Sequence, residues 1–237
     1  MPNTRITLQK WKDHYSYAKK IYIIGALLAA GIASLIFTVT RYVPPNERAV
    51  IVQLVDTYAD PSKLDADKPD LLAAGQEYDP SLEELSFLTI SYIGDDNYEG
   101  SQVYTVQVYA GDNDIYFQND VLTQRMVNEG YAVALEYLEG FEAFSEKYSD
   151  YIVWQAIEKE EGEEENEEEN EEEDETLDSE EHAYYVDVSP LLGINQRGAY
   201  DVRGKYALIA INSKNADTCF KVLTEMFDRF IPAEEIQ

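Results

Sequence analysis

Twenty consecutive residues without a charge, Ile21 to Thr40, constrain this chain more than any other feature of its sequence. At 1.5 Å of rise per residue, such a helix is about 30 Å long, which matches the hydrocarbon core of a bilayer. Five Lys and Arg residues and a single Asp precede the segment, and a strongly acidic chain follows it. Because the basic flank of a span stays in the cytoplasm, we predict a cytoplasmic tail over 1–20, a transmembrane helix over 21–41 and an extracellular domain beyond.

A cleaved signal peptide is the rival interpretation of this segment, with Ala30 to Ala33 as the cleavage site. The apolar run continues through Val39, which is longer than the 7–15 residues of a signal sequence. The length therefore favours an uncleaved, single-pass anchor in the cell membrane. Gly25, Ala29 and Ala33 recur every four residues, a stripe of small side chains through which two such helices can pack as a homodimer.

The formal charge of −29 is concentrated in one segment, because residues 158–181 hold 17 Asp and Glu residues and one Lys. That segment has almost nothing apolar to bury and cannot offset the entropy lost on ordering. We predict a disordered insertion that divides the outer domain into residues 42–157 and 182–237. An acidic surface repels phosphate backbones, so nucleic acid is not an expected partner.

Cys219 is the only cysteine, so the chain forms no internal disulfide and no thiolate metal cluster. We expect this side chain to be buried, as free cysteines usually are. The lack of paired cysteines in an extracellular domain favours a bacterium whose exterior does not rely on oxidative folding.

The outer domain alternates apolar, β-branched runs with segments of helical periodicity, which predicts an α/β or α+β fold around one mixed sheet. The predicted strands cover residues 48–56, 85–93, 102–110, 114–117, 182–189 and 205–212. The predicted helices cover a short piece at 71–74 that stops at Gly75, a segment at 121–130 capped by Asn119 or Asp120, and the stretches 138–159 and 216–227.

The loop between the second and third predicted strands resembles the start of a calcium loop, because Asp95, Asn97 and Glu99 alternate and Gly100 follows. The twelfth position is Val106, where calcium loops need a bidentate Glu, and both flanks are predicted strands. A polar hairpin loop is the favoured interpretation, with weak calcium binding as the alternative. No other cofactor is predicted.

Two further sets of residues are candidate ligand contacts. Asp112 and Asp114 precede the strand that contains Tyr116, where carboxylates and an aromatic ring suit a cation or an amine, although Asp is also a common turn former. Arg197 and Arg203 lie in a glycine-rich loop, 193–204, and can receive a carboxylate or a phosphate.

The common catalytic constellations lack a required residue. His14 is predicted to lie inside the cell, which leaves His182 as the only outer imidazole, and we expect it to be a solvated residue beside the acidic run. We therefore predict a domain that is not an enzyme, although a hydrolase that uses carboxylates alone remains formally open.

Residues 110–141, AGDNDIYFQNDVLTQRMVNEGYAVALEYLEGF, resemble a segment of the type 2 periplasmic-binding fold of extracellular solute-binding proteins. Residues 184–192 and 205–227 resemble the closing strand and helix of the same family. The resemblance covers about half of the outer domain and implies a reduced, membrane-anchored relative from Gram-positive bacteria. The chain departs from that family in being shorter than its two-lobed members and in having a helical anchor where a lipidated cysteine is usual.

Together these features predict a membrane-anchored extracellular domain that binds a small ligand or a protein partner at the cell surface. The alternative, from a different class, is a structural or assembly subunit of a membrane protein complex.

Overall fold

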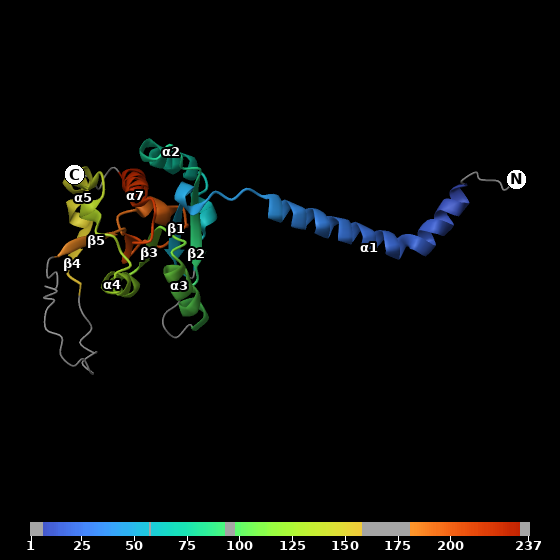
Figure 1. Cartoon of the computed structure of the whole chain (residues 1–237), viewed down its shortest axis with the longest axis horizontal. Coiled ribbons are helices and arrows are strands. Elements are labelled where there is room, and N and C mark those ends of the chain that lie inside the picture. Colours follow the sequence, from blue (N-terminus) through green and yellow to red (C-terminus); the bar gives the residue numbers. More distant parts are fainter. Residues whose placement is uncertain (1–6, 57, 93–97, 158–180, 233–237) are drawn as a thin grey trace, which may run out of the picture. The chain divides into compact units, whose positions relative to one another are not determined.

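In a computed structural model of the chain, residues 7–56, 58–92, 98–157 and 181–232 are described. The chain divides into two compact units, Met1–Val43 and Pro44–Gln237 (Figure 1). The predicted end of the membrane segment at residue 41 lies two residues before this division. Most of the predicted disordered insertion, residues 158–181, lies outside the described residues.

In its described residues, the first unit contains one helix, α1 (Leu8–Thr40). Its portion Trp11–Thr40 is long and apolar enough to cross a membrane, and its large apolar side chains are exposed, as a lipid-facing surface requires. The helix starts 13 residues before the predicted span, because residues 8–20 contain neither Gly nor Pro to interrupt it. An N-terminal signal sequence can pass the same test of helix length and composition, so the orientation and retention of the anchor stay predictions.

The second unit is an α/β fold, which confirms the predicted fold class: one six-stranded mixed sheet carries helices on both faces. The strand order is β2-β1-β3-β6-β5-β4, with β2, β1 and β3 parallel and the remaining pairings antiparallel. The strands are β1 (Ala49–Val55), β2 (Glu84–Ile90), β3 (Ile115–Asn119), β4 (Ile152–Gln155), β5 (His182–Asp187) and β6 (Lys205–Ile209).

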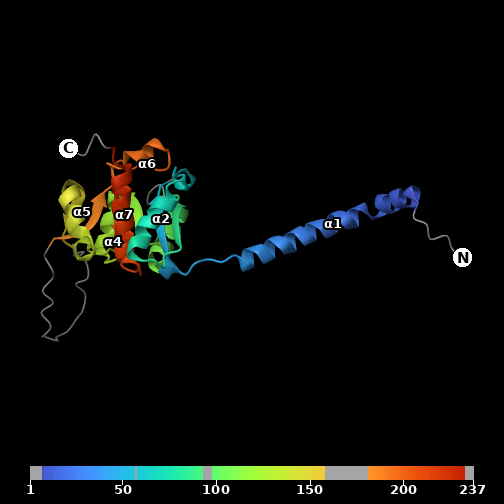
Figure 2. The ribbon, with the colours of Figure 1, turned by 90° about the horizontal axis from the view of Figure 1, so that it is seen from above.

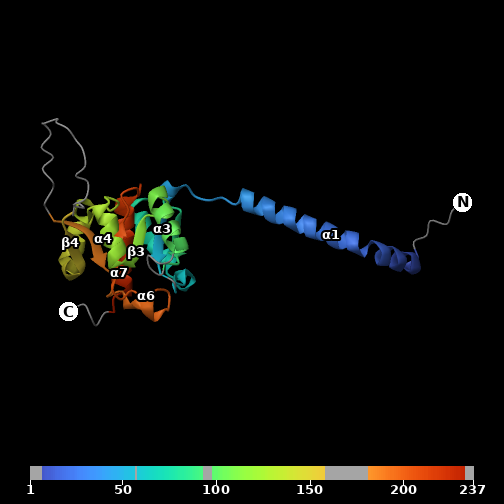
Figure 3. The same ribbon diagram turned by 90° about the horizontal axis from the view of Figure 1, so that it is seen from below.

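The helices form a layer on each face of the sheet. One hydrophobic cluster joins the sheet to α2, α5, α6 and α7 (Figure 2), and a second cluster joins its other face to α3 and α4 (Figure 3). The helices of this unit are α2 (Lys68–Tyr78), α3 (Tyr98–Ala110), α4 (Asp120–Asn128), α5 (Phe141–Tyr148), α6 (Leu192–Gln196) and α7 (Ala216–Phe230). Short 3₁₀ turns lie at η1 (Asn46–Arg48), η2 (Pro61–Leu64), η3 (Leu135–Tyr137) and η4 (Ser149–Tyr151).

Five of the six predicted strands are confirmed within a few residues, as are the C-terminal helix and the buried Cys219. The predicted cap of α4 is also confirmed: the Asn119 side chain accepts a hydrogen bond from the backbone N–H of Leu122 at 3.0 Å. Gly130, with φ of 74°, follows the end of that helix in the left-handed conformation that glycine tolerates.

The predicted strand over residues 102–110 is wrong, because these residues form most of α3. The Val and Tyr content of the segment is typical of strands. However, β2 and β3 run parallel on either side of β1, so the chain between them has to cross back over the sheet. Parallel strands are joined in this way by a helix, and the topology outweighs the local preference.

Two helix predictions are corrected in part. The stretch 138–159 was expected to be helical, but α5 ends at Tyr148 and residues 152–155 form the edge strand β4, whose Ile, Val and Trp pair with β5. Gly75 does not end its helix but lies inside α2. A Cβ there would lie 2.7 Å from Leu82 and 3.2 Å from Val222 of α7, so this glycine permits close packing.

A buried carboxylate ties the end of α7 to the start of α2. The Asp67 side chain is 6% exposed; its Oδ2 lies 3.1 Å from Nε of Arg197, and its Oδ1 lies 3.3 Å from a terminal nitrogen of Arg229. Arg197 also lies over the ring of Phe230, the last residue of α7, at 4.9 Å. Arg197, a predicted ligand residue, is therefore a structural contact here.

We expect Asp67→Asn to lower the free energy of unfolding by about 3 kcal/mol, because two arginines lose the anion that compensates them. Asp65→Asn is the matched control: Asp65 pairs with Lys68 at 2.7 Å but is 60% exposed, so its loss should cost less than about 1 kcal/mol. Urea unfolding of the detergent-solubilised chain, followed by circular dichroism, measures both values. Equal losses would show that burial of Asp67 is energetically unimportant.

Candidate functional site

The loops that follow β1 and β3 both start at the carboxyl ends of these parallel strands, but they lead to opposite faces of the sheet. After β1 the chain passes to α2 on one face and on to β2, whereas after β3 it passes to α4 on the other face. Such a divergence at the carboxyl ends of neighbouring parallel strands is where open α/β sheets usually bind ligands. The polypeptide enters β1 from Pro44 at the opposite edge.

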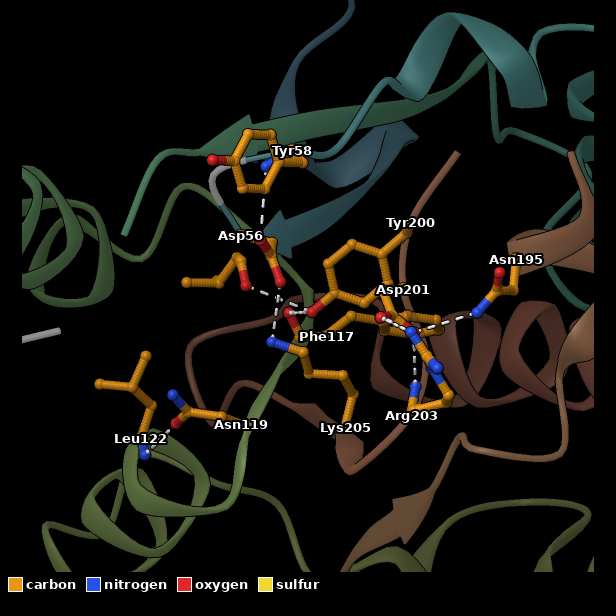
Figure 4. A network of polar contacts seen from close by, with 11 residues as sticks. Asp56, Tyr58, Phe117, Asn119, Leu122, Asn195, Tyr200, Asp201, Arg203 and Lys205 are labelled. Atoms are coloured by element: carbon orange, nitrogen blue, oxygen red, sulfur yellow. Dashed lines mark hydrogen bonds and ion pairs between the residues drawn. The ribbon is translucent and has the colours of Figure 1, made fainter. Parts of the chain in front are cut away.

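Tyr200 bridges the carboxyl ends of these two strands. Its hydroxyl lies 2.9 Å from the carbonyl oxygen of Phe117 in β3 and 3.2 Å from that of Val55 in β1, and donates to this pair of acceptors (Figure 4). Tyr200 is only 3% exposed, and the neighbouring carbonyl of Ala199 accepts a hydrogen bond from the N–H of Asp60 at 2.7 Å. The ring therefore forms a fixed floor.

Above this floor lies a surface pocket of about 300 Å³. Its walls come from the loop after β1, from α6 and from the loop between α6 and β6. The described residues that line it are Asp56, Tyr58, Asn195, Gly198, Tyr200 and Asp201. The Tyr58 side chain is 90% exposed, so an aromatic ring stands at the rim with most of its surface available.

One of the two carboxylates of the pocket faces a lysine from the antiparallel half of the sheet. Asp56 Oδ2 lies 2.9 Å from Nζ of Lys205, the first residue of β6, and the two side chains are 25% and 16% exposed. The N–H of Tyr58 donates to Asp56 Oδ1 at 3.3 Å. A carboxylate offers about four acceptor positions, so these described contacts leave Asp56 with capacity for a further donor.

The second carboxylate, Asp201, is held by a bidentate arginine. Arg203 donates from Nε to Oδ1 at 2.9 Å and from a terminal nitrogen to Oδ2 at 2.6 Å, and Asn195 donates to Oδ1 at 3.0 Å (Figure 4). The hydrogen bonds from Arg203 lower the pKa of Asp201 to about 2. The pocket therefore retains this anion at any physiological pH.

The other predicted ligand residues lie elsewhere. Asp114 precedes Ile115, which pairs with Ile209, whereas Arg203 precedes Lys205, which pairs with Asn119. Asp114 and Arg203 therefore lie at opposite ends of the paired strands β3 and β6. The structure does not bring the predicted acidic and basic candidates together.

Asp114 has a structural role at its end of the sheet. It is 8% exposed; its Oδ2 accepts from the N–H of Ile51 at 2.8 Å and its Oδ1 accepts from the hydroxyl of Ser213 at 2.7 Å. Burial raises the pKa of this carboxyl. Tyr116 is 1% exposed beneath α3 and cannot contact a ligand from solvent, whereas Asp112 is exposed.

Only part of the predicted calcium loop lies within the described residues. Asp95 and Asn97 lie outside the described residues, and Glu99 lies in the first turn of α3, so the expected strand after the loop is replaced by a helix. Among the residues that the structure does describe, no three His, Cys, Asp or Glu side chains come together as a metal site. Calcium binding stays an untested prediction.

The expectation that His182 is solvated is wrong. Its side chain is 12% exposed, and its Nδ1 lies 2.5 Å from Oε1 of Glu136, whose other oxygen accepts from the N–H of Ala183 at 3.1 Å. The rings of Tyr137 and Tyr184 lie against the imidazole. This pair anchors the start of β5 to the turn η3, so the histidine has a packing role that its flanking acidic sequence does not indicate.

The sequence indicates some of the residues near the pocket but not that they come together. Asp56 ends the predicted strand 48–56, and Lys205 begins the predicted strand 205–212, but only the strand order shows that these termini meet. Arg203 was predicted as a ligand contact, whereas its neighbours Tyr200 and Asp201 were not.

No protein-family model matches the chain, and no curated protein or solved structure shows significant similarity to it.

The buried Tyr200 should make stability fall at alkaline pH. Burial, reinforced by Asp56 and Asp201, raises the pKa of Tyr200 well above 10 in the folded domain. A raised pKa stabilises the fold below the unfolded value of about 10, and this contribution is lost as the pH rises towards the folded pKa. We expect Tyr200→Phe to flatten the fall above pH 10 by about 1.4 kcal/mol per pH unit, the equivalent of one proton.

At pH 7 the same Tyr200→Phe change should cost about 1–3 kcal/mol, because the Phe117 and Val55 carbonyls lose their donor. Tyr58→Phe is the control, since that side chain is 90% exposed. Urea unfolding at a series of pH values from 7 to 11 measures both effects. Parallel pH profiles for the wild type and Tyr200→Phe would contradict the assignment.

Proposed function

We propose that the chain is a single-pass membrane protein whose extracellular α/β domain binds a small polar ligand in the pocket between Asp56, Tyr58 and Asp201, without converting it. The supporting observation is the position of the pocket, at the divergence of the loops after β1 and β3, where open sheets bind ligands. The pocket also lies at the sheet edge opposite the entry of the chain into β1.

The lining favours a ligand with an amino group. Both carboxylates, Asp56 and Asp201, border the pocket, and the exposed ring of Tyr58 offers a face to a cation. Lys205 and Arg203 pair with these carboxylates but are not among the described residues that line the pocket. A volume of about 300 Å³ suits a molecule of amino-acid to dipeptide size.

Binding without chemistry is favoured by the residue types at the pocket. None of the described lining residues is a His, Cys or Ser, so no activated nucleophile of the familiar kinds borders the space. The anionic form of Asp201, fixed by Arg203, is also unsuited to act as a general acid near neutral pH.

Membrane anchoring through α1 is the second part of the proposal. We expect the full-length chain to remain in the pellet after alkaline carbonate extraction, with the intact N-terminus detected by mass spectrometry. Protease added outside cells with permeable walls should remove the domain and leave a fragment that contains the basic tail. A soluble protein with its N-terminus removed after residue 30 would identify α1 as a signal sequence instead.

Ligand binding can be tested on the detergent-solubilised chain by thermal shift with amino acids, dipeptides, polyamines, sugars and calcium in separate samples. We expect an amine-bearing compound to raise the melting temperature, because a ligand at 100 times its Kd adds about 2.7 kcal/mol to folding stability. Tyr58→Ala should abolish this shift.

Tyr137→Ala is the matched control, because Tyr137 is 75% exposed and does not line the pocket. Its variant should keep the shift of the wild type. No shift with any compound, or a shift that survives Tyr58→Ala, would count against the proposed pocket.

A further inference from the structure

Helix α1 is longer than the hydrocarbon core that it is proposed to cross. Its 33 residues correspond to a length of about 50 Å, whereas a hydrocarbon core is about 30 Å thick. The excess of about 20 Å falls on the N-terminal side, where residues 8–20 precede the charge-free run. These residues, the juxtamembrane segment, therefore lie at the membrane surface or beyond it.

The juxtamembrane segment has the opposite charge to the outer domain. It contains four Lys residues and one Asp, a formal charge of +3, whereas residues 44–237 contain 46 Asp and Glu residues against 12 Lys and Arg residues, a formal charge of −34. Trp11 and Tyr15 in the segment are 64% and 56% exposed. Lysines beside a span attract anionic lipids, and Trp and Tyr rings favour the interface between headgroups and acyl chains.

One face of the segment forms a surface hollow of about 520 Å³. The described residues that line it are Trp11, Lys12, Tyr15, Ser16 and Lys19. Lys12 and Lys19 are seven residues apart, so they lie on the same side of the helix and about 10 Å apart along its axis, with Ser16 between them. Asp13, the one acidic residue of the segment, does not line the hollow.

We propose that this hollow binds the headgroup phosphate of an anionic phospholipid in the leaflet at the N-terminal end of the span. The ammonium groups of Lys12 and Lys19 and the hydroxyl of Ser16 supply donors for the phosphate oxygens. The rings of Trp11 and Tyr15 border the glycerol and the first part of the acyl chains. The inference rests on the anchoring by α1 proposed above, and it is independent of ligand binding in the outer domain.

The position of the hollow favours a lipid over a soluble acidic partner. Lys19 lies two residues before Ile21, about 3 Å along the helix from the start of the charge-free run, which is within the headgroup layer. Nε2 of His14 lies 2.7 Å from the hydroxyl of Tyr22, so the segment is joined to the first turn of the span. Figure 1 shows that α1 bends towards its N-terminal end, which keeps the segment nearer the membrane plane than a straight helix would. A soluble partner would have to displace these headgroups.

Trp11 can report the contact, because Trp154 is the only other tryptophan of the chain. The full chain with Trp154→Phe is reconstituted in phosphatidylcholine vesicles that contain a constant share of brominated phosphatidylcholine, whose bromine quenches tryptophan on contact. We expect the quenching of Trp11 fluorescence to rise as phosphatidylglycerol replaces the unbrominated lipid. High sodium chloride should reduce this rise, because salt screens the attraction. Both leaflets have the same composition, so the orientation of the chain in the vesicle does not affect the result.

Two neighbouring lysines provide a matched pair of variants. Lys19→Gln should raise the phosphatidylglycerol fraction needed for half of the quenching rise about two- to fivefold, because a lysine near an anionic surface strengthens binding by about fivefold. Lys12→Gln should have the same effect. Lys20→Gln is the control: it removes the same charge one residue nearer the span, but Lys20 does not line the hollow. Its variant should change the fraction by less than half as much.

Equal effects of Lys19→Gln and Lys20→Gln would overturn the hollow as a site and indicate a diffuse attraction to the whole segment. Quenching that does not depend on phosphatidylglycerol, in a chain that resists carbonate extraction, would overturn the recognition of anionic lipid and leave the anchoring intact. Protein that carbonate extracts would overturn the anchoring, and with it the lipid site. An anchored chain whose Trp11 is not quenched at any lipid composition would assign the segment to a soluble partner and would also overturn the proposal.

Discussion

The first strand of the domain, β1, is buried on both faces, and this requirement determines much of the remaining architecture. With β2 and β3 parallel to β1 on either side, the chain needs two helical crossovers, and the helix layers cover both faces. Even the polar residue of the strand is satisfied internally: Gln53 is fully buried and, with its amide oxygen turned towards β2, accepts from the N–H of Ile90 at 2.8 Å. The pocket follows from the same arrangement, because the loops after β1 and β3 diverge.

Local patterns predicted the elements better than the connections between them. Strands such as 48–56 and 205–212 carry apolar, β-branched runs, and α7 repeats its apolar residues at helical spacing, so both kinds of element are visible in the sequence. Residues 102–110 were misassigned because Val and Tyr favour strands, while the parallel order of β2, β1 and β3 requires a helix there. Strand order is a long-range property that a single segment does not contain.

The candidate site was predictable only in fragments, for the same reason. Arg203 was predicted as a ligand contact, but it is the partner of Asp201, and the separate set of predicted acidic contacts, which includes Asp114, lies at the far end of β3. Tyr200 carries no sequence signal at all: its role depends on two carbonyl groups more than 80 residues away along the chain, at Phe117 and Val55. Buried groups such as Asp114 and His182 likewise acquire their partners from remote segments.

The hairpin of β4 and β5 has a consequence for the acidic run that connects them. Gln155 and His182 are direct partners in the antiparallel ladder, so the chain leaves the fold and re-enters it across a gap of about 5 Å. Closing a longer loop between the same two points costs only about 0.6 kcal/mol for each doubling of its length. The fold therefore places little constraint on the number of residues in this segment. Its length, and with it the charge that the domain displays, can change by insertion or deletion without any change in the packed core.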